Sequence, residues 1–145
     1  MWEWLLRIFR PGPGSSSGGE GERRAAEWLQ RERRFEVVTR NWRSPRDRRE
    51  ELDLVCRDGD VLVFVEVKAR AAGALVPGYF AVNRRKKRIL RRAVATYLRG
   101  LAEKPRTFRF DIVEVTLAAG GGRGEHPPEI RHFENVPLFS KHFRP

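Results

Sequence analysis

Apolar residues dominate two stretches of Glu51–Lys68, which reads ELDLVCRDGDVLVFVEVK. Two apolar-rich runs within it are joined by Asp58-Gly59, a dipeptide whose backbone tolerates the positive φ angles of a tight turn. The second run carries valine at alternate positions on one face, and its other face is apolar before it ends in Glu66 and Lys68. The pattern therefore predicts a β-hairpin whose second strand is central and covered on both sides.

A two-residue turn with this dipeptide at its tip sets the pairing of the two strands. It places Asp53 diagonal to Glu66, about 5.5–8 Å away at the backbone, and Glu51 directly opposite Glu66. Because side chains alternate with period 2, one face is expected to carry Glu51, Asp53, Glu66 and Lys68. Three carboxylates and one lysine on one patch of sheet call for a counter-ion.

Helical spacing predicts two helices. Three apolar residues lie three, four and seven positions after Glu22, so Glu22 is expected on the inward side of a helix over Glu22–Arg34. An acid at the start of a helix is also an ordinary partner for the helix dipole, and that simpler role stays open. A second helix is predicted from the cap residue Asn83 to about Leu101.

Further strands are predicted by β-branched and aromatic content at Phe35–Trp42, Phe108–Val115 and, as a short edge strand, Glu129–Phe133. Strands interleaved with helices in this order predict an α/β fold with a central mixed sheet of about four to five strands flanked by helices. Residues 1–20 are expected to be an apolar segment and a flexible Gly/Pro/Ser linker, residues 21–136 one domain, and residues 137–145 a tail.

The composition and net charge of the chain indicate which class of molecule it binds. The chain has 145 residues, which suits a single domain, and a formal net charge of +11. Such a charge favours an anionic partner, most often nucleic acid and less often a membrane surface, although arginine-rich codon usage would give the same composition. The lone Cys56 excludes an internal disulfide and suits a reducing cytoplasm. No apolar run approaches the roughly 20 residues of a membrane span, and apolar Met1–Arg10 is interpreted either as a docking helix or as a poorly ordered or packed end.

Cations concentrate at the start of the second helix, where the helix dipole favours anions instead. A solvated face is the simpler interpretation, but a bound phosphate backbone would relieve the repulsion. The residues expected to contact nucleic acid are Arg70, Arg84, Arg85, Lys86, Lys87, Arg88 and Arg91.

The charged face of the hairpin suggests metal-dependent chemistry. Asp53 and Glu66 supply oxygen ligands that suit Mg²⁺ or Mn²⁺, and Glu22 could complete the shell directly or through a water. Lys68, about 6.6–7 Å along the strand from Glu66, could orient or help deprotonate the attacking water, or neutralise charge on a phosphate. These roles fit hydrolysis of a phosphodiester. The three histidines show no metal-ligand spacing.

The order acid, Asp, Glu-x-Lys resembles the PD-(D/E)xK nuclease superfamily, whose fold is the restriction-endonuclease-like three-layer sandwich. More narrowly, the chain resembles the bacterial YraN-type family of candidate endonucleases, which is similar to Holliday-junction resolvases. The motifs that carry this resemblance are Gly21-Glu22, Arg40-Asn41-Trp42-Arg43, Glu51-Leu52-Asp53-Leu54-Val55, Val63–Arg70, Lys86 and Arg109-Phe110-Asp111-Ile112-Val113.

The resemblance implies that Asp53, Glu66 and Lys68 are catalytic, with Glu22 as accessory acid. The sequence departs from the pattern in two places. Leu52 stands where the superfamily name has proline. Glu50 stands where the family usually has glycine, and the loop Ser44–Glu50 is longer and more basic than usual. The second departure leaves the role of Glu51 open.

Two functions are therefore expected from the sequence. The first is a Mg²⁺- or Mn²⁺-dependent endonuclease acting on DNA, with branched or damaged DNA among its candidate substrates, in the cytoplasm and, by analogy with resolvases, as a homodimer. The alternative is a non-catalytic nucleic-acid-binding module, in which Lys68 pairs with Glu66 or Asp53. A membrane-associated role for Met1–Arg10 is compatible with either.

Overall fold

The computed structural model describes residues 17–71, 83–117 and 128–145. The predicted apolar segment Met1–Arg10 and residues 11–16 of the expected linker lie outside the described residues.

The described chain forms two helices and five strands. In order they are α1 (Ser17–Glu32), β1 (Glu36–Arg43), β2 (Glu51–Asp58), β3 (Val61–Ala71), α2 (Arg84–Gly100), β4 (Thr107–Leu117) and β5 (Glu129–Phe133). The strands make one open sheet in the order β1-β2-β3-β4-β5, in which β3 and β4 are parallel and the other pairs antiparallel. The predicted α/β class with a mixed sheet is confirmed, and so is the short edge strand β5.

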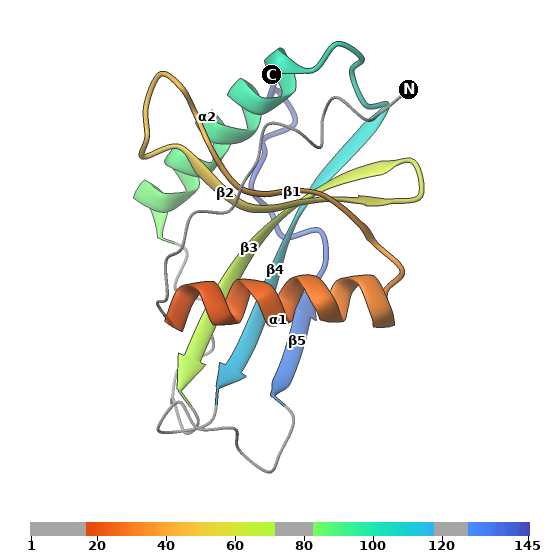
Figure 1. The fold of residues 1–145 in the computed structure, drawn as a ribbon. Helices are drawn as coiled ribbons and strands as arrows, with labels where there is room; N and C mark the ends of the chain where they lie inside the picture. The colour runs from red at the N-terminus through yellow and green to blue at the C-terminus, as the bar shows by residue number, and fades with distance from the viewer. Residues whose placement is uncertain (1–16, 72–82, 118–127) are drawn as a thin grey trace.

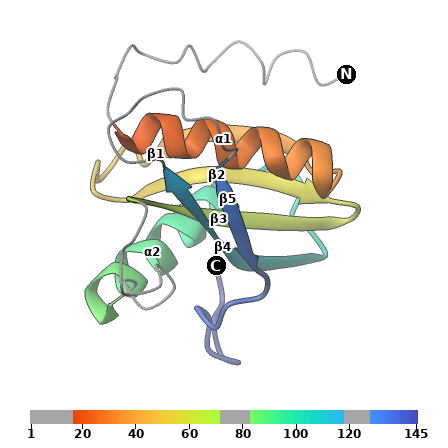
Figure 2. The same cartoon turned by 90° about the horizontal axis from the view of Figure 1, so that it is seen from below.

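The helices lie on opposite faces of the sheet, which gives the three layers of the predicted sandwich (Figures 1 and 2). On the α1 side, Ala25, Ala26 and Leu29 pack on Val63 and Val65 of β3. On the α2 side, one core cluster joins Leu62 and Phe64 of β3 to Leu90, Val94 and Leu98 of the helix. Strand β3 is therefore buried on both faces, as its apolar pattern predicts.

Helix α1 begins at Ser17, earlier than the predicted Glu22, inside the stretch expected to be a linker. Gly21 lies within this helix and packs against β3. A Cβ atom at Gly21 would lie 2.8 Å from the Cβ of Ala69 on β3, so the helix approaches the strand at a distance that only glycine allows. The glycine that suggests flexibility in the sequence is a contact point between the helix and the strand in the structure.

The pairing of β2 with β3 differs by one step from the prediction. Asp58 pairs with Val61 and the ladder continues to Leu54 with Val65, so Gly59 and Asp60 form the turn. Gly59, with φ of 56°, occupies the first turn position, as glycine does in type II′ hairpins. Asp58 stays in the strand, where its Oδ2 accepts a hydrogen bond from Arg109 Nη1 at 3.0 Å. The ladder ends at Leu54 and Val65, so Asp53 and Glu66 lie just beyond its last pair.

The C-terminal residues that were expected to be a tail pack against the α2 side of the sheet. Leu138 belongs to the buried core together with Val136, the last residue of the predicted domain, and Phe139 and Phe143 pack on it. Arg91 of α2 also donates a hydrogen bond from Nη1 to the Leu138 carbonyl at 3.1 Å. These contacts fix the end of the chain beside α2.

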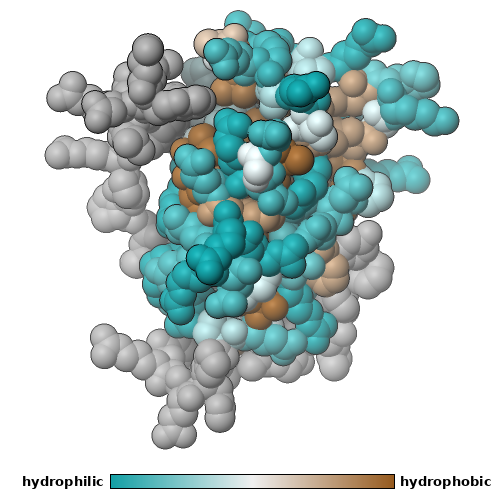
Figure 3. Space-filling model, turned by 90° about the vertical axis from the view of Figure 1, so that its right-hand side faces the viewer, coloured by the Kyte–Doolittle hydropathy of each residue, from teal (hydrophilic) through white to brown (hydrophobic). Residues whose placement is uncertain are grey.

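The surface seen from the right-hand side of Figure 1 is mainly hydrophilic, with small separate hydrophobic areas (Figure 3). No helix in the described ranges is long and apolar enough to cross a membrane.

Candidate active site

The predicted acids gather where β2 and β3 separate. The ladder between these strands ends at Leu54 and Val65, and beyond it the Val67 N–H donates to Asp53 Oδ2 at 2.8 Å. Leu52 and Val55 both belong to the α2-side core, so strict alternation of faces is not kept through this part of β2. The regular alternation on which the prediction rests is therefore interrupted in β2, and a shared face for Glu51, Asp53, Glu66 and Lys68 stays a prediction. The Asp53 carboxylate accepts the hydrogen bond that a backbone carbonyl would accept in a continued ladder. We call the point where β2 and β3 separate the fork.

Glu66 is the most buried acid of the fork, at 3% exposure. Its Oε1 lies 3.0 Å from Lys68 Nζ on the same strand and 3.3 Å from Lys86 Nζ of α2. Its Oε2 is buried and has no hydrogen-bond partner within the described ranges. One oxygen of this carboxylate is thus held by two lysines while the other is unsatisfied.

The setting of Asp53 opposes its ionisation. Burial, and next to it the negative charge of Glu66, raise the pKa of Asp53 from its ordinary 3.8 to about 8. The Val67 N–H and the charge of Lys86 act in the other direction but do not offset them. Without another cation nearby, this setting favours the protonated form of Asp53.

Glu22 of α1 reaches the same electrostatic environment. Burial raises the pKa of Glu22, a hydrogen bond with the Asn41 side chain opposes the rise, and the charges of Glu51 and Glu66 add to it. Asn41 lies in β1 with φ of 50°, a left-handed conformation that asparagine tolerates better than most residues. Glu22 therefore lies on the inward side of α1, as predicted, and is not merely a partner for the helix dipole.

Glu51 has a partner on the neighbouring strand. Its Oε2 lies 3.3 Å from Arg43 Nε, and Arg43 is also its register partner on β1. Both side chains are largely exposed. Glu51 is thus an ion-paired charge at the rim of the acid cluster, close enough to affect Glu22.

The predicted nucleic-acid contacts divide into two groups. Arg84, Arg85 and Arg88 are exposed at the start of α2, and Lys87 is partly exposed. Three others are occupied within the protein: Lys86 contacts Glu66, Arg91 contacts the Leu138 carbonyl, and Arg70 Nε lies 3.7 Å from the buried Glu114 of β4. These three side chains therefore make contacts within the protein.

The donor set suits a hard divalent cation. Asp53, Glu66 and Glu22 are carboxylates, which Mg²⁺ and Mn²⁺ prefer, and the unsatisfied Glu66 Oε2 is an acceptor that a cation would satisfy. Across the described parts of the chain no group of three or more His, Cys, Asp or Glu side chains is arranged to ligate a metal. The carboxylates therefore affect one another's pKa, but in the described residues they do not form a set of three metal ligands.

The sequence did not predict the roles of two site residues, Asn41 and Lys86. Asn41 belongs to the Arg40-Asn41-Trp42-Arg43 motif, and an asparagine within a strand is the only sequence signal for its left-handed turn toward Glu22. Lys86 was grouped with the cations expected to bind nucleic acid. No local pattern separates it from Lys87, because the contact with Glu66 depends on how α2 packs on the sheet.

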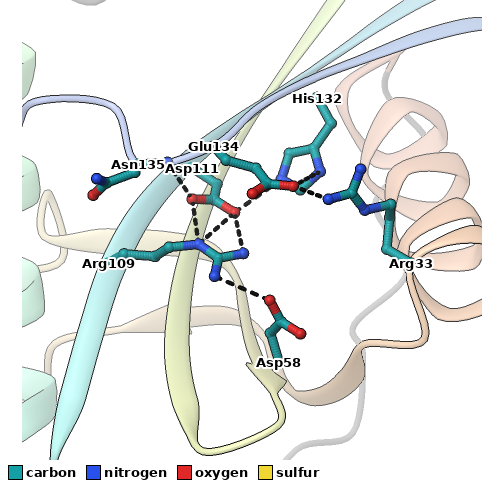
Figure 4. A network of polar contacts seen from close by, with 7 residues as sticks. All are labelled: Arg33, Asp58, Arg109, Asp111, His132, Glu134 and Asn135. Atoms are coloured by element: carbon teal, nitrogen blue, oxygen red, sulfur yellow. Dashed lines mark hydrogen bonds and ion pairs between the residues drawn. The ribbon is translucent and has the colours of Figure 1, made fainter.

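A second polar cluster serves the fold (Figure 4). Asp111 is fully buried and accepts from Arg109 Nε at 3.0 Å and from Asn135 N at 2.9 Å, and His132 Nε2 lies 2.8 Å from its Oδ2. Burial alone would raise the pKa of Asp111, but these hydrogen bonds hold it below its ordinary value. Glu134 links the cluster to Arg33 near the end of α1. His132 is therefore structural, as its lack of ligand spacing suggests.

Known proteins match most of the chain. The model of the "Uncharacterised protein family UPF0102" matches residues 21–115. A UPF0102 protein of Anaeromyxobacter dehalogenans is 45% identical over 111 residues, covering 77% of this chain and 80% of the relative. Relatives of the same name are 47% identical over 110 residues in Beutenbergia cavernae and 36% over 121 residues in Geobacter metallireducens, covering 75% and 83% of this chain and 90% and 91% of the relatives.

Proposed function

We propose that this chain, which belongs to the uncharacterised protein family UPF0102, is a metal-dependent endonuclease that hydrolyses phosphodiester bonds in DNA. The observation that carries the proposal is the fork between β2 and β3. There a buried carboxylate oxygen of Glu66 has no described partner, beside an Asp53 whose ionisation is opposed by the same burial and charge. A divalent cation relieves both conditions at once.

The chain's own residues supply the rest of the reaction. Asp53 is oriented by the Val67 N–H, and Glu66 by Lys68. Lys68 carries a fixed positive charge beside the acids, where it stabilises the negative charge that develops on a phosphate during hydrolysis. The exposed arginines at the start of α2 hold the flanking phosphates. A cation bound by Asp53 and Glu66, with Glu22 directly or through a water, would polarise the phosphate and lower the pKa of the attacking water.

The resemblance to known nucleases adds the superfamily, the kind of DNA substrate and the oligomeric state to this proposal. A place in the PD-(D/E)xK nuclease superfamily and a preference for branched or damaged DNA are carried over from the family resemblance. Homodimerisation is carried over from resolvases, whose substrate has two-fold symmetry. A buried, unpaired Cys56 suits a reducing compartment, and we place the protein in the cytoplasm on that ground.

A second candidate is a non-catalytic nucleic-acid-binding module. It is favoured by a specific observation: Lys68 and Lys86 both contact Glu66 Oε1, so the protein itself offsets part of the charge of the acid cluster. In this alternative the fork is a structural ion-pair cluster. The cationic start of α2 would still bind the nucleic-acid backbone.

A cleavage assay separates the two candidates. Purified protein is incubated with end-labelled junction, flap, single-stranded and duplex DNA, with Mg²⁺, with Mn²⁺ or with a chelator. The endonuclease proposal predicts cleavage that needs the cation and that falls by at least about 100-fold in Asp53→Ala and in Lys68→Ala, because each removes a group acting at the reacting phosphate.

The control variant is Glu129→Ala, which removes an exposed acid of β5 and should cleave like the parent protein. Cleavage that survives Asp53→Ala or Lys68→Ala would identify a contaminating nuclease. Metal-independent binding without cleavage of any substrate, with a logarithm of affinity that falls steeply against the logarithm of salt concentration, would select the binding module.

A further inference from the structure

Lys86 links two parts of the molecule that the proposed function treats separately. Its backbone N–H donates to Asn83 Oδ1 at 2.9 Å, which caps α2 and fixes the position of the first turn. Its side chain turns inward and places Nζ 3.3 Å from Glu66 Oε1. Arg84, Arg85 and Arg88 in the same part of the helix are exposed. One helical turn therefore presents cations both to the acid cluster and to the surface.

The inward lysine competes with a divalent cation for the same charge. Lys68 reaches Glu66 from two positions away on the same strand, whereas Lys86 reaches it from another layer of the molecule. Lys86 also acts electrostatically on Asp53. An ammonium group this close to Glu66 and Asp53 repels a divalent ion that approaches them, and the flexible four-carbon stem of lysine allows it to move away.

We propose that Lys86 is the resident counter-ion of the acid cluster, that a divalent cation displaces it, and that the displaced ammonium group then binds the nucleic-acid backbone at the start of α2. The inference rests on the proposed function, since it assumes cation binding by Asp53 and Glu66. Cation binding frees Lys86 for a phosphate, and a phosphate that attracts Lys86 leaves the acids free for the cation. By linkage each ligand strengthens the binding of the other.

The first measurement is Mn²⁺ affinity without DNA, from the electron paramagnetic resonance signal of free Mn²⁺ in titrations of the full chain. Lys86→Met removes the competing charge and should bind Mn²⁺ about 3–10-fold more tightly than the parent protein. Lys86→Arg retains the charge and should bind like the parent. Lys87→Met is the matched control, because Lys87 is the next lysine of the same turn and no ion pair joins it to an acid within the described ranges.

The second measurement is the affinity for a labelled duplex, from fluorescence anisotropy with and without Ca²⁺, a hard cation that also takes carboxylate oxygens. Lys87→Met should bind the duplex more weakly than the parent, because Lys87 is itself an expected phosphate contact, but in both proteins Ca²⁺ should tighten binding by the same factor of about 5. In Lys86→Met the gain should be less than about half as large, because no ammonium group is released. Thermal unfolding of each variant confirms that it is folded.

The outcomes separate this inference from the proposed function. Equal Mn²⁺ affinities in Lys86→Met, Lys87→Met and the parent would overturn the counter-ion role while leaving the nuclease proposal standing. Tighter Mn²⁺ binding with an unchanged effect of Ca²⁺ on the duplex would overturn the coupling. Absence of Mn²⁺ binding in the parent and in every variant would overturn the inference together with the proposed function.

Discussion

At the scale of single residues, Asp53 has the most unusual environment in the described fold. It replaces a backbone acceptor at the fork, and the same position exposes it to the charges of Glu66 and Glu22. A carboxyl group that is costly to ionise in the folded protein makes the stability depend on pH. The sign follows from the direction of the shift.

The pKa of Asp53 is about 8 in the folded protein and near 3.8 when unfolded, so the folded state retains a proton that the unfolded state has lost between these values. The stability that this proton confers is complete below about pH 4 and is lost as the pH rises through 8. Asp53→Asn removes the titration. We expect the variant to be more stable than the parent at pH 8.5, by up to about 5 kcal/mol, with the gain vanishing near pH 4.

Urea unfolding at pH 4.5, 6.5 and 8.5 without divalent cations checks this prediction. Glu129→Ala, at an exposed carboxylate, should show no such divergence from the parent. Parallel stability profiles of Asp53→Asn and the parent across this range would show that Asp53 is ionised in the fold at neutral pH.

The acids of the site could be found from the sequence because charged residues interrupt an otherwise apolar strand. Glu66 and Lys68 follow from that pattern, and Asp53 follows from the hairpin. The register could not be found, because Asp58-Gly59 is compatible with more than one turn and contacts such as that of Asp58 with Arg109 join residues that lie far apart in the sequence. The left-handed backbone of Asn41 likewise depends on tertiary contacts.

At the scale of elements, the approach of α1 to β3 decides where Glu22 lies. Gly21 contacts Ala69, and the next residue of the helix is Glu22. The Gly/Ser-rich composition of this region predicts a linker, because composition does not distinguish a flexible glycine from one that allows close packing. Only the position of β3 reveals the difference.

Gly21→Ala tests this contact. Alanine favours a helix over glycine by about 1 kcal/mol, but the added methyl group meets the Cβ of Ala69 at 2.8 Å. Overpacking of this kind costs about 1–3 kcal/mol, so we expect a net loss of stability of up to about 2 kcal/mol in urea unfolding, with weaker Mn²⁺ binding as Glu22 moves away. The double variant with Ala69→Gly should recover most of both losses.

Gly100→Ala is the matched control, because nothing lies within 4 Å of an added methyl group at the end of α2. It should be neutral or slightly stabilising. A stabilising effect of Gly21→Ala equal to that of Gly100→Ala would mean that α1 does not pack closely on β3.

At the scale of the whole molecule, the fold class and family were accessible from the sequence, and the predicted YraN-type family is confirmed as UPF0102. Strand and helix periodicities depend on residues that are close in the sequence, so they can be recognised without knowing the tertiary structure. The packing of the C-terminal residues on α2 and the polar cluster around Asp111 were not predicted. Both depend on contacts between residues that are far apart in the sequence.

The cluster around Asp111 joins four separate parts of the chain and should dominate stability rather than activity. Asp111→Ala leaves Arg109 and His132 without their buried acceptor, and we expect a loss of about 3–5 kcal/mol in urea unfolding at neutral pH. Because the pKa of Asp111 is lowered in the fold, this contribution is present above about pH 4 and is lost as the pH falls further.

The surface pair of Glu129 and Arg131 on β5 provides the comparison, since exposed ion pairs contribute about 0–1 kcal/mol. A loss in Asp111→Ala no larger than in Glu129→Ala would show that the buried cluster contributes little to folding.

The central claim is that the fork between β2 and β3 holds a divalent cation. Anomalous X-ray diffraction from crystals of the full chain soaked in Mn²⁺ measures this directly. We expect an anomalous peak about 2.0–2.6 Å from carboxylate oxygens of both Asp53 and Glu66, with Lys86 Nζ moved away from Glu66. Mn²⁺ peaks elsewhere on the protein only, with Glu66 still held by both lysines, would contradict it.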